Sequence, residues 1–304
     1  MNFGYAKLCI ICIENRCPQD EQSICIRQCN NLIELLENQG SHYQINQNSI
    51  LLRQEYTFPL MGVTSETKLI DTTSLRLGDI AECVTGIYSG ADTQFLRRSA
   101  QNRQGIEKYP EITTDKICPK ESFRPAFDGY EGEQCFVPLL KGGGYPYLKP
   151  ELWFIDWSRE AIHHYKTDKK SRFQNSRFYF RRGIGFPMVS SGRATATVIL
   201  DSWLFDQSVV GIFPKEVETF GFLLAFLNSN VCWKLLRQIN PSTNNSAKYL
   251  QRLPIILPSQ ETLKWFQQTV SFYLEELMQG CERNLQIEQD LEKKICEIYD
   301  PFLH

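Results

Sequence analysis

The sequence has no long apolar run, no secretory signal and no internal repeat. A membrane-spanning helix needs about 20 consecutive apolar residues, whereas the longest apolar run, Leu8–Ile13, has the length of a β-strand. The first residues also lack the basic start and apolar core of a signal peptide. These absences argue against membrane and secreted classes, so we expect a cytoplasmic protein without a membrane partner.

Histidine is scarce, and the cysteines lack the paired spacing of a zinc site. There are four histidines, and the adjacent His163 and His164 would diverge by about 100° on a helix, a poor geometry for sharing one metal ion. The eleven cysteines form an odd count in a chain without a secretory signal, which favours reduced thiols. Five of them gather near the N-terminus: Cys9, Cys12, Cys17, Cys25 and Cys29. Because their later spacings repeat no CxxC pair, we predict buried apolar cysteines and no metal.

The 304-residue chain has a formal net charge of −2, but its charges are unevenly distributed. Residues 159–193 hold nine Lys or Arg against two acids, and residues 261–304 hold nine acids against four bases. A nearly neutral protein can bind nucleic acid through one basic segment. An unevenly charged but merely solvated surface is the alternative explanation.

Residues 1–60 have the pattern of a partial α/β segment. Apolar residues predict a strand at 8–13 and an extended piece over 49–59, while Ile24–Leu36 has helical spacing that ends near Gly40. Residues 61–74 are rich in Thr and Ser with mixed charges, which predicts a linker.

Residues 75–258 are predicted to form a mixed, strand-rich recognition domain, and residues 259–304 to form C-terminal helices. The whole chain is therefore expected to be α+β. The individual segments are strands at 178–180, 186–189 and 193–200 and helices at 157–165, 220–235, 263–281 and 287–298, the first of the long helices being interrupted around 228–230.

The segment Leu77–Arg98, LGDIAECVTGIYSGADTQFLRR, is the most informative pattern in the chain. Gly86 and Gly90 permit backbone geometry and a close approach to a ligand that a Cβ resists. Ser89 and Asp92 add polar groups, and Arg97 and Arg98 supply planar cations suited to phosphate oxygens or a guanine edge. A β-turn with a polar tip explains the two glycines and Asp92 equally well.

Cations also alternate with aromatic rings later in the chain, a pattern suited to phosphate contacts combined with base or sugar contacts. A solvated strand face is the alternative. The candidates are Lys141, Tyr145, Arg177, Tyr179, Arg181, Arg182, Ser190, Ser191 and Arg193. The loop from Lys141 to Tyr145 contains three glycines without the spacing of a phosphate-binding loop, so nucleotide binding is not expected.

The Leu77–Arg98 pattern resembles the opening of the target recognition domain of TaqI-like and Eco57I-like adenine-N6 DNA methyltransferases. Further stretches resemble the same domain in the same order: Phe186–Arg193, Asp201–Pro214, Phe222–Ser229, Asn240–Thr243 with Leu253–Ile255, and Asp290–Tyr299. The resemblance covers about residues 75–300. Residues 1–60 resemble the last strand-helix-strand of such an enzyme, after its active site.

The motifs that carry catalysis in this family do not occur in the chain. The sequence contains no (N/D)PPY/F segment, which holds the flipped adenine, and no FxGxG-type loop for S-adenosylmethionine. The resemblance therefore implies the specificity module of a restriction-modification or BREX-type phage-defence system. It also implies that S-adenosylmethionine is bound by a catalytic partner or a missing N-terminal half, and that this chain itself binds no cofactor.

Three functions are weighed on these residues. The first is sequence-specific binding of double-stranded DNA for a methyltransferase catalytic subunit or domain, with no catalytic residues in this chain. The second is a non-catalytic interaction or scaffold protein derived from such a domain. An independent nuclease is the third, but Gly86-Ile87-Tyr88 has no YIG partner and Glu66-Thr67-Lys68 has no upstream acidic context.

Overall fold

The computed structural model describes residues 23–29, 32–46, 65–119, 127–150, 152–240 and 242–302. These residues belong to two compact units, Met1–Val63 and Thr64–His304, each treated by itself below. The predicted segments at 8–13 and 49–59, and Cys9, Cys12 and Cys17, lie outside the described residues.

In the first unit, strands β1 (Ser23–Gln28) and β2 (Ser41–Asn46) pair antiparallel, and the short helix α1 (Leu32–Leu36) lies between them in the chain. The helix predicted over 24–36 is therefore wrong in its first half. Ile24 and Ile26 are β-branched and alternate along β1, which suits pairing with β2. Cys25 is exposed, so the predicted burial is wrong for this cysteine: a two-stranded pair leaves one face uncovered.

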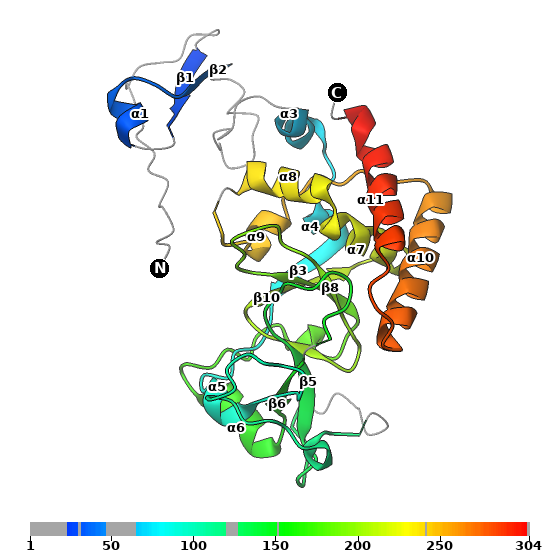
Figure 1. Cartoon of the computed structure of the whole chain (residues 1–304). Helices are drawn as coiled ribbons and strands as arrows, with labels where there is room; N and C mark the ends of the chain where they lie inside the picture. The colour runs from blue at the N-terminus through cyan, green and yellow to red at the C-terminus, as the bar shows by residue number, and fades with distance from the viewer. Residues whose placement is uncertain are drawn as a thin grey trace. The chain divides into compact units, whose positions relative to one another are not determined.

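Two four-stranded sheets organise the second unit (Figure 1). The first has the order β3-β10-β7-β8 and is antiparallel throughout; the second has the order β4-β6-β5-β9, with only β5 and β9 parallel. The strands of the first sheet are β3 (Ala81–Thr85), β10 (Val209–Pro214), β7 (Gly183–Pro187) and β8 (Thr197–Ile199). The strands of the second are β4 (Leu96–Arg98), β6 (Trp153–Asp156), β5 (Phe136–Leu140) and β9 (Leu204–Phe205).

Helices cover both sheets, which makes the fold α+β as predicted (Figure 1). The α-helices of this unit are α3 (Ser65–Thr72), α4 (Leu77–Ile80), α5 (Asp92–Phe95), α6 (Arg159–Thr167), α7 (Phe220–Asn228), α8 (Asn230–Ile239), α9 (Ala247–Leu250), α10 (Gln260–Met278) and α11 (Leu285–Tyr299). Short 3-10 turns occur at η2 (Thr114–Lys116), η4 (Ser176–Phe178), η5 (Val217–Thr219) and η6 (Asp300–Phe302). Part of the predicted linker thus forms α3, whose Leu69 is buried in the same core as α8.

The first sheet is buried on both faces. On one face, Ile184 and Phe186 of β7 and Ile212 of β10 join the core formed with the C-terminal helices. On the other face, Val209 and Phe213 of β10 join the core of the second sheet. This double burial explains why the β10 sequence VVGIFP is almost continuously apolar instead of alternating.

Helix α7 is the centre of the helical layer, with every residue from Phe220 to Asn228 buried. The chain breaks at Ser229, whose hydroxyl accepts a hydrogen bond from Cys232 N and begins α8, so the predicted interruption is confirmed. Within the described residues, no single helix has the length and apolarity to cross a membrane. Val217–Asn228 and Asn230–Ile239 meet that test only as a pair bent by 74°, and both segments contribute to the buried core.

Candidate nucleic-acid interface

The segment from Lys169 to Arg182 presents six exposed cations on the second unit. We call these residues the basic strip: Lys169, Lys170, Arg172, Arg177, Arg181 and Arg182. Over the described residues, Arg177 is the only member with an ion pair, at 3.9 Å from Glu82, and its side chain is 71% exposed. The strip therefore keeps most of its positive charge available to an anionic partner.

The loop of the Leu77–Arg98 motif holds the backbone of the strip. Arg172 N donates to Tyr88 O at 2.9 Å, and Tyr88 N donates to Arg172 O at 3.1 Å. Asn175 Nδ2 donates to Thr85 O at 2.9 Å, and Gln174 Nε2 donates to Gly86 O at 3.0 Å. The motif thus acts as the support on which the strip lies.

Gly86 and Gly90 are required by packing inside the protein. A Cβ on Gly86 would lie 1.8 Å from Phe205 O, which is backbone and cannot move aside. Gly90 has φ +78°, and a Cβ there would lie 2.6 Å from Ser171 Oγ. The close approach predicted for these glycines is therefore made to the chain's own backbone and side chains.

Between Arg177 and Arg181 the chain makes a tight turn that buries three aromatic rings and leaves the two cations exposed. The predicted strand at 178–180 is wrong, because the chain forms the 3-10 turn η4 and then a left-handed residue, Phe180, at φ +56°. Tyr179 is buried, and its hydroxyl donates to Gln174 O at 2.7 Å, so this candidate supports the strip from below.

Aromatic rings also orient the guanidinium groups. Those of Arg177 and Arg181 lie 4.8 and 5.8 Å from the centre of the Phe178 ring. That of Arg182 lies 4.7 Å from the centre of the Phe220 ring. Such contacts hold a guanidinium group over a ring while the N–H edge of that group stays in solvent.

Ser89, Asp92 and Lys141 form an internal ion network. Lys141 Nζ lies 3.0 Å from both Asp92 and Asp206, and Ser89 Oγ donates to Asp92 at 2.6 Å. Burial by itself would lower the pKa of Lys141, but the two carboxylates outweigh it and raise that pKa above its usual value. Lys141 is thereby tied to Asp206, and Tyr145 in the same loop is half-buried and lies near Lys149.

Arg97 and Arg98 are also engaged within the protein. Arg98 is 9% exposed, donates to Tyr109 O and Asn102 O, and pairs with Glu111 at 3.1 Å. Arg97 is half-buried and donates to two carbonyls of its own turn at 2.9 Å. Both arginines brace loops of the second sheet.

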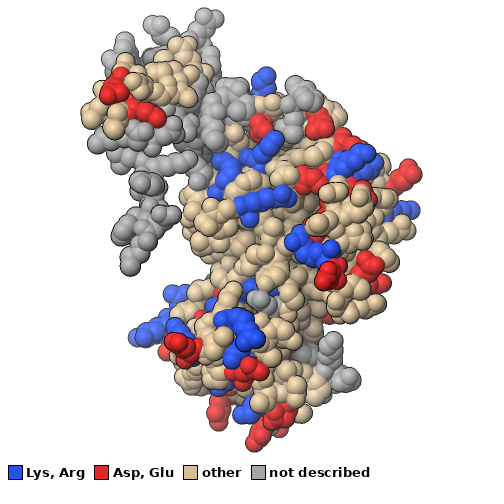
Figure 2. All heavy atoms as spheres, in the orientation of Figure 1, with Lys and Arg blue, Asp and Glu red and all other residues tan. Residues whose placement is uncertain are grey.

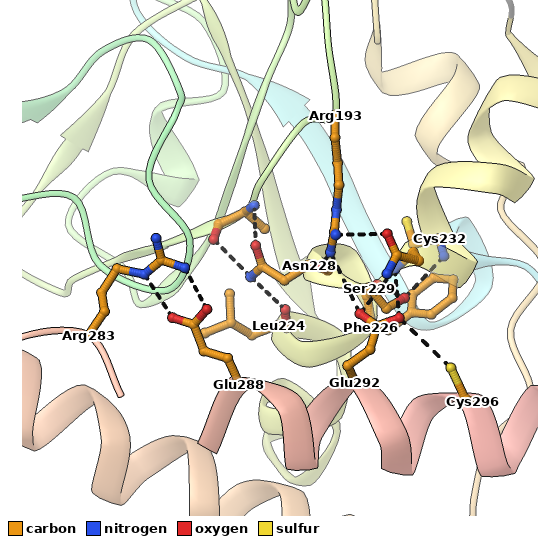
Figure 3. A network of polar contacts seen from close by, with 12 residues as sticks. Arg193, Leu224, Phe226, Asn228, Ser229, Cys232, Arg283, Glu288, Glu292 and Cys296 are labelled. Atoms are coloured by element: carbon orange, nitrogen blue, oxygen red, sulfur yellow. Dashed lines mark hydrogen bonds and ion pairs between the residues drawn. The ribbon is translucent and has the colours of Figure 1, made fainter. Parts of the chain in front are cut away.

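Arg193 anchors the chain after β7 to the C-terminal helices (Figure 3). It donates to Asn230 Oδ1 at 2.7 Å and to Asn228 O, and lies 3.6 Å from Glu292 of α11. Ser190 Oγ accepts from Asn245 at 3.0 Å, whereas Ser191 is exposed. Since Ser89, Arg98 and Tyr179 are buried, the fifteen sequence candidates do not form one continuous exposed surface.

A second group of cations was missed by the sequence analysis. Lys and Arg side chains gather over α8 and α9 on the face drawn in Figure 2, and these helices carry Lys234, Arg237 and Lys248. Arg237 lies 4.3 Å from the Trp233 ring and donates to Ser242 O at 2.5 Å. The three positions are spread over two helices, so no basic run marks them in the sequence.

Among the described residues, no three His, Cys, Asp or Glu side chains are grouped as a metal site requires. The cysteines in this part of the chain are free thiols. Burial raises the pKa of Cys83 to about 12, which makes this thiol unreactive at neutral pH.

Comparison with known proteins finds a similarity to an adenine-specific methyltransferase. It is 28% identical over 195 residues to the adenine-specific methyltransferase PglX of Lacticaseibacillus casei (strain Zhang). The match covers 62% of this chain but 15% of the relative, so the chain spans a small part of that protein's length. No protein-family model matches the chain. The similarity supports an adenine methyltransferase-related protein.

Proposed function

We propose that this chain is the DNA-binding specificity part of an adenine-N6 DNA methyltransferase system. The basic strip is the observation that carries the proposal, because six exposed cations lie within the short segment from Lys169 to Arg182. The similarity to an adenine-specific methyltransferase supplies the context.

In the proposed mechanism, the basic strip neutralises phosphates of one duplex. Each neutralised phosphate releases counterions and contributes about 0.9 to the slope of log affinity against log salt, so six contacts would give a slope near −5. The strip positions the duplex, since phosphate contacts fix register without reporting sequence. A catalytic partner, or another part of a longer protein, would bind S-adenosylmethionine and flip the adenine.

The test compares two triple variants with the same change in charge. K170A/R181A/R182A removes three cations of the strip, whereas K116A/K264A/K293A removes three exposed cations from η2, α10 and α11. Duplex affinity is measured by fluorescence anisotropy between about 50 and 200 mM salt. We expect the strip variant to lose up to about 3 from the salt slope and the control to keep the wild-type slope.

Equal losses in both variants would indicate a general charge effect and contradict the assignment of the strip. Absence of duplex binding by the wild-type protein at low salt would contradict the proposed function and favour the non-catalytic interaction role. A methyl-transfer assay adds a second test: the chain alone should transfer no methyl group to DNA, and methylation should require a partner that carries an NPPY-type motif.

A further inference from the structure

The loop that follows β7 is hydrogen-bonded to the loop between α8 and α9, and the two form one element. We call Val189–Gly192 and Ser242–Asn245 the paired loops. Ser190 N donates to Thr243 O at 3.0 Å, Asn245 N donates to Met188 O at 2.6 Å, and Val189 and Asn244 form an antiparallel bridge. The second loop connects α8 to α9.

The inward-facing polar side chains of this element are bonded within the protein. Asn245 is fully buried and donates to Pro187 O at 3.3 Å and to Ser190 Oγ at 3.0 Å. Asn240 Nδ2 donates to Asn244 O at 2.7 Å, and Ser242 Oγ donates to Asn240 Oδ1 at 2.7 Å. Arg193 fixes the other end of the first loop (Figure 3). The backbone is therefore held from both sides.

The outward-facing side chains are unengaged. Ser191, Thr243 and Asn244 are exposed, and their side chains make no hydrogen bond to any described residue. Val189 is 68% exposed although it lies two residues after the end of the buried strand β7. The paired loops thus present free hydroxyl and amide groups beside the methyl groups of Val189. Such a surface suits a ligand whose edge carries hydrogen-bond donors, acceptors and methyl groups.

Base edges in the major groove have this chemistry. Asn pairs with the N6 and N7 atoms of adenine, Ser and Thr bond to either kind of group, and apolar side chains contact the thymine methyl. Helices α8 and α9, which come before and after the second loop in the chain, carry the exposed Lys234 and Lys248, and such cations suit phosphates beside a groove. The six residue steps from Arg182 to Met188 span about 20 Å as a strand, which is shorter than one turn of DNA, about 34 Å.

We propose that the paired loops are the base-reading element of this chain, with Ser191, Thr243 and Asn244 determining sequence preference. This inference rests on the proposed function, because it assigns base readout to one surface and phosphate contacts to another. The two roles predict different measurable losses: removal of base contacts lowers preference between sequences, whereas removal of phosphate contacts lowers affinity for all sequences.

The test begins with selection of duplexes from a random library by the wild-type chain. Affinities for the selected duplex and for a scrambled duplex are then measured with S191A/T243A/N244A, with the strip variant K170A/R181A/R182A, and with a control, Q101A/Q104A, that removes exposed polar groups elsewhere. Melting temperatures check folding, and N244A alone serves as a milder variant. We expect the paired-loop variant to lose about tenfold or more in preference, with an unchanged salt slope.

An unchanged preference in the paired-loop variant would overturn the inference, as would an equal loss for both duplexes. A wild-type chain that binds duplexes but selects no sequence would also overturn it while leaving the phosphate-binding role intact. If the wild-type chain binds no duplex, the proposed function fails first and the base-reading assignment fails with it.

Discussion

The Lys141 network gives the sharpest test of the internal electrostatics. In a Lys141→Met variant, the side chain of Asp206, which is 3% exposed, would remain as a buried carboxylate without its cation. Breaking a buried pair by removing one partner costs about 3–5 kcal/mol. Asp92 is 18% exposed, so water can reach it, and it should add little to this loss.

The pH dependence follows from the raised pKa of Lys141. A cation whose pKa is higher in the folded state contributes its full stability below the unfolded pKa, about 10.4, and loses it as the pH rises through the folded value. The difference in unfolding free energy between wild type and Lys141→Met should therefore be constant from about pH 6 to 9. It should decrease only above about pH 10.5.

Urea unfolding followed by tryptophan fluorescence measures this difference. With a dependence on urea of about 3 kcal/mol per molar, the transition of Lys141→Met should shift by about 1–2 M. Lys264→Met, an exposed control, should change the unfolding free energy by less than about 0.5 kcal/mol. The double variant K141M/D206N should recover part of the loss. A change of less than about 0.5 kcal/mol in the unfolding free energy of Lys141→Met would refute the buried network. Lys141 would then again be a candidate for contacting DNA.

Three further outcomes are expected. Arg193→Ala should lower the unfolding free energy by about 1–3 kcal/mol, because Asn228 O and Asn230 Oδ1 lose a donor and Glu292 loses its ion pair while keeping its hydrogen bond from Asn230 N; a change like that of an ordinary surface residue would contradict the anchor role. Leu227→Ala, which removes a buried α7 side chain, should cost about 2–5 kcal/mol in thermal or urea unfolding. Peptide-level mass spectrometry after thiol labelling at pH 7 should find exposed Cys281 modified quickly and buried Cys83 protected, and rapid labelling of Cys83 would contradict its raised pKa.

The sequence was sufficient for the helical layer and for the general fold class. Apolar residues at helical spacing placed α10 and α11 within a few residues of their observed ends, because each helix buries one side against its neighbours. The interruption between α7 and α8 was also visible, since Ser229 is a preferred residue for beginning a helix. The sequence was misleading at Ile24–Leu36, where too few residues carry the period to separate a strand from a helix.

The roles of individual charged residues depended on the tertiary structure. Lys141 and Arg181 are both cations next to glycine-containing segments, yet Lys141 lies between two carboxylates and Arg181 faces solvent. Asp206 lies 65 residues from Lys141 along the chain, so no local sequence pattern predicts their pairing. The sequence by itself determined where cations, glycines and apolar faces occur. Only the folded chain decided which cations are neutralised internally and which remain available to a partner, because ion pairing depends on distances of a few ångströms between residues far apart in the sequence.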